Sequence, residues 1–283
     1  MASFAIAGLQ LEISRSDNLA YLRSEIEAVA SRFPWVQMVV LGELSAFGSG
    51  TARAEPPGGR IEQEFCRIAR ALRMWLVPGS FYVREDESIF NLSPVINPAG
   101  EVVARYRKMF PFLPYETGVA PGTDFVVFDV PSVGRFGVSN CYDMWFPETT
   151  RTLAAMGAEV VLHPSMTNTL DRDVELAIAR ANAASNQCYF IDINVAGQLG
   201  FGQSIICGPG GEVIHVAGRG REIMPVEIDL EAVRRVRRRG WNGIGQVLKS
   251  FRDRAVDFPI CADRSAPPDA LRALGPLRLP ERE

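Results

Sequence analysis

Short apolar runs rich in Val, Ile and Phe alternate along the chain with segments of helical period. In the first half, the apolar runs predict strands, and segments with an apolar residue every three or four positions predict helices. The expected strands are Phe4 to Leu9, Val36 to Leu41 and Trp75 to Val83, and the expected helices are Asp17 to Phe33 and Ile61 to Arg73. A hairpin is expected where Phe90 to Ile96 and Val102 to Tyr106 flank the turn Asn97-Pro98-Ala99-Gly100.

The second half of the chain repeats this layout. Helices are expected at Pro147 to Met156 and at Asp173 to Asn186. The expected strands are Phe125 to Val130, Gly134 to Ser139, Glu159 to His163, Tyr189 to Asn194, Ser204 to Cys207, Val213 to Val216 and Ile223 to Ile228. So many strands in two similar halves predict a pair of mixed sheets with helices outside, a layered α/β architecture.

Length and composition fit one large globular domain. The chain has 283 residues, of which 47% are hydrophobic and 22% charged. No linker or low-complexity tract interrupts it before about Pro259, where the chain becomes rich in Pro, Arg, Asp and Glu. We therefore expect a domain over residues 1–258 and a C-terminal extension over 259–283, loosely held or strapped onto a partner subunit.

The charge pattern argues against general binding to nucleic acid or an anionic membrane, because the formal net charge is −3. A local basic cluster comprises Arg234, Arg235, Arg237, Arg238 and Arg239. It predicts a solvated helix face or a subunit contact. Nucleic-acid binding is a weaker alternative, because no aromatic platform accompanies the arginines. The N-terminal segment lacks a basic flank, and no run of eighteen apolar residues occurs, so we expect a soluble, unexported protein.

The five cysteines are odd in number, widely spaced and without a CxxC pair. This pattern argues against a disulfide framework or a zinc site and favours a reducing cytoplasm. We expect neither a metal nor another cofactor.

Three polar residues stand where strands are expected to end, which is where ligand sites of α/β folds collect. They are Glu43 after MVVLG, Lys108 after VVARYR and Cys141 after RFGVSN. Each has a plain structural alternative. Cys141 could be a small buried hydrophobe, Lys108 a solvated surface charge, and Glu43 a cap or an ion-pair partner.

Together the three residues and their neighbours resemble the nitrilase, or carbon-nitrogen hydrolase, superfamily. The matching stretches are VVLGELSAFG, YRKMFPF and FGVSNCYDMWFPETTR, and LPYETGVAPGTDF resembles the loop that supplies a second glutamate, here Glu116. The resemblance spans about residues 4 to 230. It implies an α/β fold, a four-layer α-β-β-α sandwich, with Cys141 as nucleophile, Glu43 as general base and Lys108 stabilising the oxyanion.

The chemistry of a thiol agrees with these roles. A free thiol is mostly protonated near pH 7, so attack on a carbonyl needs a base or a positive partner, which Glu43 and Lys108 would supply. A papain-like pair of Cys141 with His163 is a weaker alternative. Glu116 would orient Lys108 or the substrate nitrogen, or else be a solvated loop carboxylate; Asp143 has no assigned role.

The resemblance also bears on the substrate. Cys141 is followed by Tyr-Asp where many nitrilases carry Trp-Glu, which favours an amide of a small molecule, with hydrolysis of an N-carbamoyl compound or of a nitrile as the alternatives. Met144 and Trp145 stand where related carbamoylases place arginines, so an anionic substrate is less supported. Tyr115, Tyr142 and Trp145 are candidates for an apolar pocket, or else simple core.

Two further expectations come with the resemblance. One is a homodimer or larger homo-oligomer formed through the helices Pro147 to Met156 and Asp173 to Asn186. The alternative from a different class is a catalytically silent scaffold of the same fold, because a fold does not guarantee activity.

Overall fold

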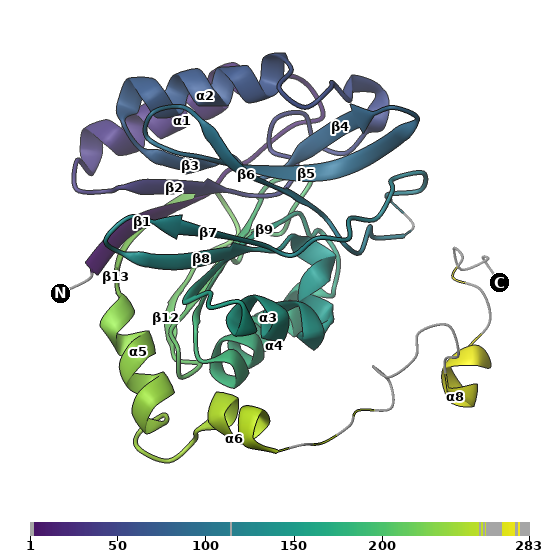
Figure 1. The fold of residues 1–283 in the computed structure, drawn as a ribbon. Coiled ribbons are helices and arrows are strands. Elements are labelled where there is room, and N and C mark those ends of the chain that lie inside the picture. Colours follow the sequence, from purple (N-terminus) through teal and green to yellow (C-terminus); the bar gives the residue numbers. More distant parts are fainter. Residues whose placement is uncertain are drawn as a thin grey trace.

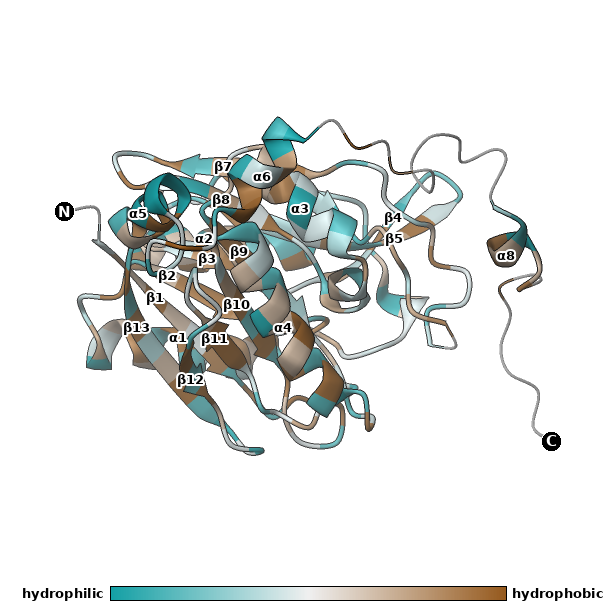
Figure 2. Ribbon diagram, turned by 90° about the horizontal axis from the view of Figure 1, so that it is seen from below, coloured by the Kyte–Doolittle hydropathy of each residue, from teal (hydrophilic) through white to brown (hydrophobic). Residues whose placement is uncertain are grey.

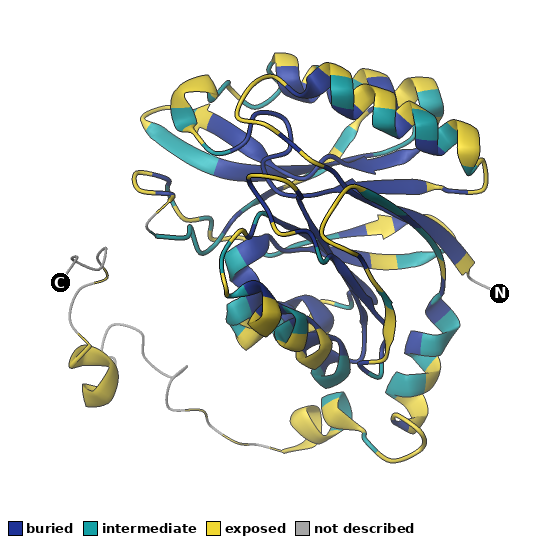
Figure 3. Cartoon of the chain, turned by 180° about the vertical axis from the view of Figure 1, so that it is seen from behind, coloured by how far each residue is buried: buried dark blue, intermediate teal, exposed yellow. Residues whose placement is uncertain are grey.

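The computed structural model describes residues 3–113, 115–254, 256, 258, 268–274 and 277. Two mixed sheets lie face to face, and helices cover the outer side of each, as Figure 1 shows. The expected four-layer α-β-β-α sandwich is thereby confirmed. Most strand residues are buried, whereas the helices expose their outer faces (Figure 3).

Among the described residues, one sheet has seven strands in the order β13-β1-β2-β3-β5-β4, with β6 paired to β5. Its strands are β1 (Ser3–Gln10), β2 (Met38–Leu41), β3 (Trp75–Val77), β4 (Phe81–Glu85), β5 (Ser88–Ile96), β6 (Val102–Arg107) and β13 (Glu222–Asp229). Strands β1, β2 and β3 are parallel, and the other pairs are antiparallel. The helices α1 (Leu19–Arg32) and α2 (Arg60–Leu72) cover this sheet (Figure 1).

The other sheet has six described strands in the order β12-β11-β10-β9-β8-β7. They are β7 (Val126–Val130), β8 (Gly134–Val138), β9 (Val160–Ser165), β10 (Tyr189–Asn194), β11 (Ile205–Cys207) and β12 (Val213–Val216). The helices α3 (Pro147–Ala155) and α4 (Arg172–Asn186) pack on its outer face, and a short 3-10 helix, η2 (Cys141–Trp145), follows β8. The remaining helical segments are η1 (Thr51–Arg53), α5 (Leu230–Arg239), α6 (Val247–Asp253) and α8 (Asp269–Arg272).

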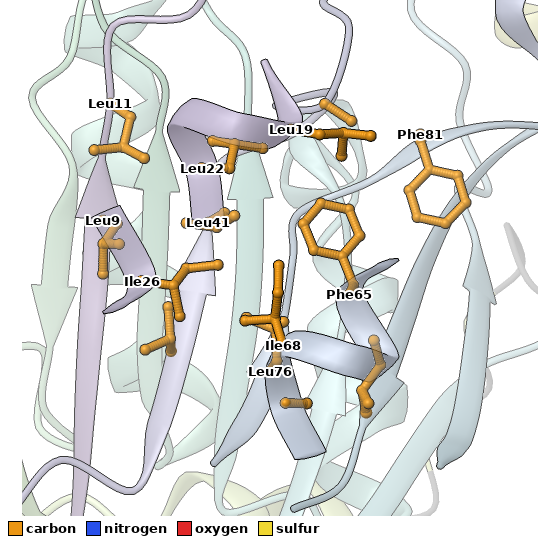
Figure 4. Close-up of a cluster of buried hydrophobic side chains, with 14 of the residues drawn as sticks. Leu9, Leu11, Leu19, Leu22, Ile26, Leu41, Phe65, Ile68, Leu76 and Phe81 are labelled. Atoms are coloured by element: carbon orange, nitrogen blue, oxygen red, sulfur yellow. The ribbon is translucent and has the colours of Figure 1, made fainter. Parts of the chain in front are cut away.

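The central strands read as continuous apolar runs because both of their faces are covered. Along β1, Phe4 and Ile6 belong to the core between the two sheets, whereas Ala7 and Leu9 belong to the core beneath α1 and α2. Figure 2 shows the resulting concentration of hydrophobic residues along the strands. The core beneath the helices includes Leu22 and Ile26 of α1, Leu41 of β2, Phe65 and Ile68 of α2, and Leu76 of β3 (Figure 4).

The expectation of one strand from Trp75 to Val83 is wrong, because the chain forms two strands, β3 and β4, with Gly79 between them. Gly79 has φ +74°, and a Cβ there would lie 1.7 Å from the carbonyl oxygen of Gly42, directly before Glu43. The dipeptide Pro78-Gly79, a turn signal within WLVPGSFYV, marks this break in the sequence, whereas the close approach to Gly42 is visible only in the structure. Gly79 therefore shapes the backbone that carries Glu43.

Gly79→Ala is expected to lower the free energy of unfolding by about 2 kcal/mol more than Gly243→Ala. Gly243 is a matched control because its φ is +76° and no atom lies within 4 Å of the position that a Cβ would take there. Chemical denaturation of the two variants measures the difference. Equal destabilisation would show that the approach to Gly42 does not constrain the fold.

The basic cluster forms the C-terminal part of α5, and the contacts of two arginines anchor the helix within its own chain. Arg234 Nε lies 2.7 Å from Glu159 Oε1, and Arg237 Nη2 donates to the carbonyl of Ala158 at 2.6 Å. Arg235 pairs with Asp229 at 2.9 Å. The cluster is thus largely engaged by carboxylates and carbonyls rather than presented as a free positive stripe.

The C-terminal extension expected over 259–283 falls mainly outside the described residues, which in this range are 268–274 and 277. They include the short helix α8. No helix of the described part of the chain combines the length and apolarity needed to cross a membrane.

Candidate active site

The two sheets bring the three strand-end residues together at one end of the sandwich. Glu43 follows β2 and Lys108 follows β6 of one sheet, whereas Cys141 follows β8 of the other. The backbone N–H of Glu43 donates to the carbonyl of Ser165 at the end of β9, at 3.1 Å. This bond ties the ends of the two sheets together, so side chains far apart in the sequence face the same space.

A buried ammonium lies between two buried carboxylates. Lys108 Nζ lies 2.8 Å from Glu43 Oε1 and 2.7 Å from Glu116 Oε2. The exposed fractions are 2% for Glu43 and Lys108, 5% for Glu116 and 7% for Cys141. The alternatives of a solvated Lys108 and a solvated Glu116 are therefore wrong.

Asn91 of β5 connects this group, and the sequence analysis missed it. Its Nδ2 donates to Glu43 Oε1 at 2.8 Å and to Glu116 Oε1 at 2.7 Å, and its Oδ1 accepts from Asn140 Nδ2 at 3.2 Å. One side chain thus contacts both carboxylates and the residue before Cys141. The available signal was an amide within the otherwise apolar run SIFNLSPVI, since a buried polar residue requires hydrogen-bond partners.

Cys141 begins η2 with φ +49°, an uncommon conformation for a residue with a side chain. Asp143, which had no assigned role, stabilises this turn. Its Oδ2 accepts from the backbone N–H of Asn140 at 2.9 Å and from the Tyr106 hydroxyl at 2.6 Å, and its Oδ1 accepts from the backbone of Phe110 at 2.9 Å. Asp143 therefore joins the backbone around Cys141 to the segment around Lys108.

His163 lies behind Cys141 rather than beside its sulfur. Its Nε2 is 3.0 Å from the carbonyl oxygen of Cys141, and its Nδ1 is 2.7 Å from Ser139 Oγ. Burial lowers the pKa of His163 to about 4, so the ring is neutral at pH 7. A neutral ring that donates from Nε2 and accepts at Nδ1 satisfies both contacts, and the papain-like pairing with the thiol does not fit this geometry.

The electrostatics favour a neutral thiol beside an ammonium in the resting protein. Burial, together with the Glu43 carboxylate, raises the pKa of Cys141 well above its usual value against the opposing effect of Lys108. Burial also raises the pKa of Glu43, although Lys108 opposes the rise. Burial lowers the pKa of Lys108, but Glu43, Cys141 and Glu116 outweigh it, and the net pKa is well above normal. A carboxyl group of raised pKa is a stronger base than a solvated one and can also return the proton that it accepts.

A cavity of about 280 Å³ opens onto these groups. Tyr115, Tyr142 and Trp145, the three expected pocket residues, all line it, and Tyr115 is the most exposed of them at 64%. The segment between β9 and α4 and the first turn of α4 contribute further lining residues that the sequence analysis missed: Met166, Thr167, Asn168, Thr169 and Asp171 from the segment, and Glu175 from the helix. Among the residues that the structure describes, no group of three or more His, Cys, Asp or Glu side chains could hold a metal ion.

Iodoacetamide is expected to alkylate Cys141 before Cys188 and Cys207, at a rate that rises with pH above neutrality. Cys141 lines the cavity, whereas the other two are buried away from it. The thiolate is the reactive form, and burial raises the pKa of all three thiols, so access through the cavity rather than thiolate fraction sets the expected order. Mass spectrometry of timed reactions gives the order. Faster labelling of Cys188 or Cys207 would contradict access to Cys141 through the cavity.

A thiol, a carboxyl group and an ammonium opening together onto a small enclosed space are suited to nucleophilic attack on an electrophilic carbon. Fold and site thus define the class of thiol hydrolases built on an α-β-β-α sandwich. The family model described as carbon-nitrogen hydrolase matches residues 4–238. The chain therefore belongs to the carbon-nitrogen hydrolase family, and it is a hydrolase of carbon–nitrogen bonds other than peptide bonds.

Two relatives and one solved structure illustrate the similarity. The omega-amidase NIT2 of Homo sapiens is 28% identical over 279 residues, covering 91% of this chain and 97% of that protein. The deaminated glutathione amidase of Homo sapiens is 29% identical over 205 residues, but the match covers only 65% of this chain and 63% of that protein. Nit3 of Saccharomyces cerevisiae, a nitrilase-superfamily structure, superposes with a TM-score of 0.77 at 27% identity, covering 84% of this chain and 94% of Nit3.

Proposed function

We propose that this protein hydrolyses an amide of a small molecule to a carboxylic acid and ammonia. In this proposal Cys141 is the nucleophile, Glu43 the general base and acid, and Lys108 the oxyanion stabiliser. The observation that carries it is the fully buried Lys108–Glu43 pair, 2.8 Å apart, in a cavity that Cys141 also lines. The two human relatives, both amidases, support an amide as substrate.

In the first half of the reaction, Glu43 takes the thiol proton as the sulfur of Cys141 bonds to the amide carbon. Negative charge moves onto the carbonyl oxygen, where the ammonium of Lys108 and the backbone N–H of Tyr142 stabilise it. The carbon–nitrogen bond then breaks as Glu43 returns the proton to the leaving nitrogen. Ammonia departs and a thioester on Cys141 remains.

In the second half, Glu43 is again a carboxylate and removes a proton from water. The water oxygen bonds to the thioester carbon, the carbon–sulfur bond breaks, and the thiol regains its proton from Glu43. The sum is amide plus water giving acid plus ammonia. One carboxyl group acts in both halves, so histidine is not required.

Glu116 and Asn91 would act by positioning rather than by touching the reacting atoms. Glu116 Oε2 holds Lys108 Nζ at 2.7 Å and accepts from the backbone N–H of Phe112 at the same distance. Asn91 fixes the carboxylates of Glu43 and Glu116 relative to each other. Because two carboxylates face one ammonium, Lys108 stays charged through the cycle and remains directed at the site.

Release of ammonia from a panel of small amides, N-carbamoyl compounds and nitriles tests the proposal, with Cys141→Ala as control. Turnover of amides that depends on Cys141 is the expected result. Preferential turnover of an N-carbamoyl compound or a nitrile would replace the amide assignment with one of those alternatives. No turnover of any compound would favour the catalytically silent scaffold.

We further propose a homodimer or higher homo-oligomer formed through α3 and α4. Both helices lie on the outer face of the six-stranded sheet (Figure 1), and Met156 beside α3 and Val174 of α4 are exposed apolar side chains. Light scattering at micromolar concentration tests this assembly, and a monomeric mass would contradict it.

The setting that fits these proposals is a reducing cytoplasm, without nucleic-acid or membrane partners. The four cysteines that the structure describes, Cys66, Cys141, Cys188 and Cys207, are free thiols. The engaged arginines of α5 give no support to a nucleic-acid contact. Residues 1–258 would form the catalytic domain and 259–283 its extension.

A further inference from the structure

At the end of the cavity next to α4, acidic side chains take no part in the proposed reaction. Asp171, just before α4, and Glu175, in its first turn, both line the cavity. Beyond Lys108, the one cationic side chain among the described lining residues is Arg15, which is exposed and therefore screened by solvent. The α4 end is thus electronegative.

Arg172 is the nearest buried cation, but it offsets the negative charge at this end only in part. Its Nη2 lies 2.5 Å from Asp192 Oδ2 and 2.8 Å from the carbonyl of Gln203, while its Nη1 lies 3.1 Å from Glu175 Oε2. One guanidinium is shared between two buried carboxylates, which leaves one negative charge uncompensated. Arg172 is not among the cavity-lining residues, so it is not available to a substrate carboxylate.

Glu175 is the buried carboxylate of this group that faces the cavity. Its side chain is 5% exposed, and its Oε1 accepts from the Thr167 hydroxyl at 3.1 Å and from Trp145 Nε1 at 3.5 Å. Two carboxylate oxygens offer about four acceptor positions, so these contacts leave room for another donor. Burial raises the pKa of Glu175 against the opposing effect of Arg172, so the Arg172 guanidinium does not fully offset the cost of burying this carboxylate.

The distance between the Cys141 sulfur and the Glu175 carboxylate limits the length of a substrate that contacts both. Thr167 Oγ1 lies 3.9 Å from Cys141 Sγ and 3.1 Å from Glu175 Oε1. The Thr167 hydroxyl therefore spans the gap between nucleophile and carboxylate. A group that pairs with Glu175 while its amide carbon meets the sulfur must be joined to that carbon by a short spacer.

We propose that the cavity selects amides that carry a cationic group, such as an ammonium, a short spacer away from the scissile carbonyl, with Glu175 as its main partner and Asp171 as a second. This inference rests on the proposed amide hydrolysis. A substrate carboxylate at the same place would meet the like charges of both residues. The N-terminus of α4, which would otherwise attract an anion, carries negative charge of its own, because Asp171 stands at its N-cap and Glu175 in its first turn.

Two amides of equal size separate charge from size: 3-aminopropanamide is cationic and butanamide is its neutral isostere. Succinamate, which has the carbon chain of butanamide but ends in a carboxylate, is the anionic member of the set. For the unaltered enzyme, kcat/KM is expected to be about tenfold or more higher for 3-aminopropanamide than for butanamide, and lowest for succinamate. Glu175→Gln is expected to remove most of that ratio. Asp173→Asn is the matched control because Asp173 belongs to the same helical turn but is exposed and does not line the cavity.

Binding to Cys141→Ala, measured by calorimetry with unreacted 3-aminopropanamide and butanamide, gives the same comparison without turnover. Asp171→Asn is a second variant, at a half-buried residue that lines the same cavity. It is expected to reduce the preference for the cationic amide less than Glu175→Gln does. A preference for butanamide or succinamate, or a cationic preference that persists in Glu175→Gln, would overturn the inference. Turnover of none of the three amides by the unaltered enzyme would instead count against the proposed amide hydrolysis.

Discussion

Cys141→Ala is expected to reduce amide turnover by a factor on the order of 10⁴ or more while leaving a folded protein. Removing the nucleophile removes the covalent path, and neither Glu43 nor Lys108 can replace a sulfur. The substitution deletes one small atom from a turn whose hydrogen bonds run through Asn140 and Asp143. Ammonia release and the thermal midpoint of the same preparation measure the two effects.

Cys66→Ala is the matched control for this substitution. Cys66 is a half-buried thiol on α2 that does not line the cavity, and its substitution is expected to leave turnover near normal. Equal losses in the two variants would point to damaged folding, and retained turnover in Cys141→Ala would refute the nucleophile.

Lys108→Arg is expected to lower kcat/KM roughly a hundredfold or more, a loss of about 3 kcal/mol in transition-state stabilisation. Charge is kept, but a planar guanidinium cannot occupy the place of a compact ammonium held between Glu43 and Glu116. Steady-state kinetics on the best amide of the panel measure the change.

The burial of Lys108 also changes what is expected of stability. A solvated lysine would tolerate Lys108→Arg with hardly any effect on the fold, but this side chain is fully enclosed, so a larger group should lower stability by about 1–3 kcal/mol. Arg107→Lys is the control, since Arg107 is partly exposed and pairs with Glu85. It is expected to retain near-normal kinetics and stability. Near-normal kinetics of Lys108→Arg itself would refute the oxyanion role.

The layered α/β architecture could be predicted from the sequence because it depends on local periodicity. In α2, Ile61, Phe65, Ile68 and Ala69 recur at helical spacing and are buried beneath that helix, and the continuous apolar runs of the central strands follow from two covered faces. The break between β3 and β4 is signalled by the turn dipeptide Pro78-Gly79, but the close approach of Gly79 to Gly42 could not be predicted, because Gly42 is far away in the chain.

The sequence by itself also determined which residue types stand at the strand ends, so Glu43, Lys108 and Cys141 could be named before any contact was known, and the resemblance of LPYETGVAPGTDF to a family loop added Glu116. Only the tertiary structure decided that Lys108 is enclosed rather than solvated, that Asn91 joins both carboxylates, that His163 faces the Cys141 carbonyl, and that Glu175 faces the cavity. Periodicity along a chain records which face of an element is buried. It does not record which side chains meet across two packed sheets, because such contacts depend on sheet register and on the approach of segments distant in sequence.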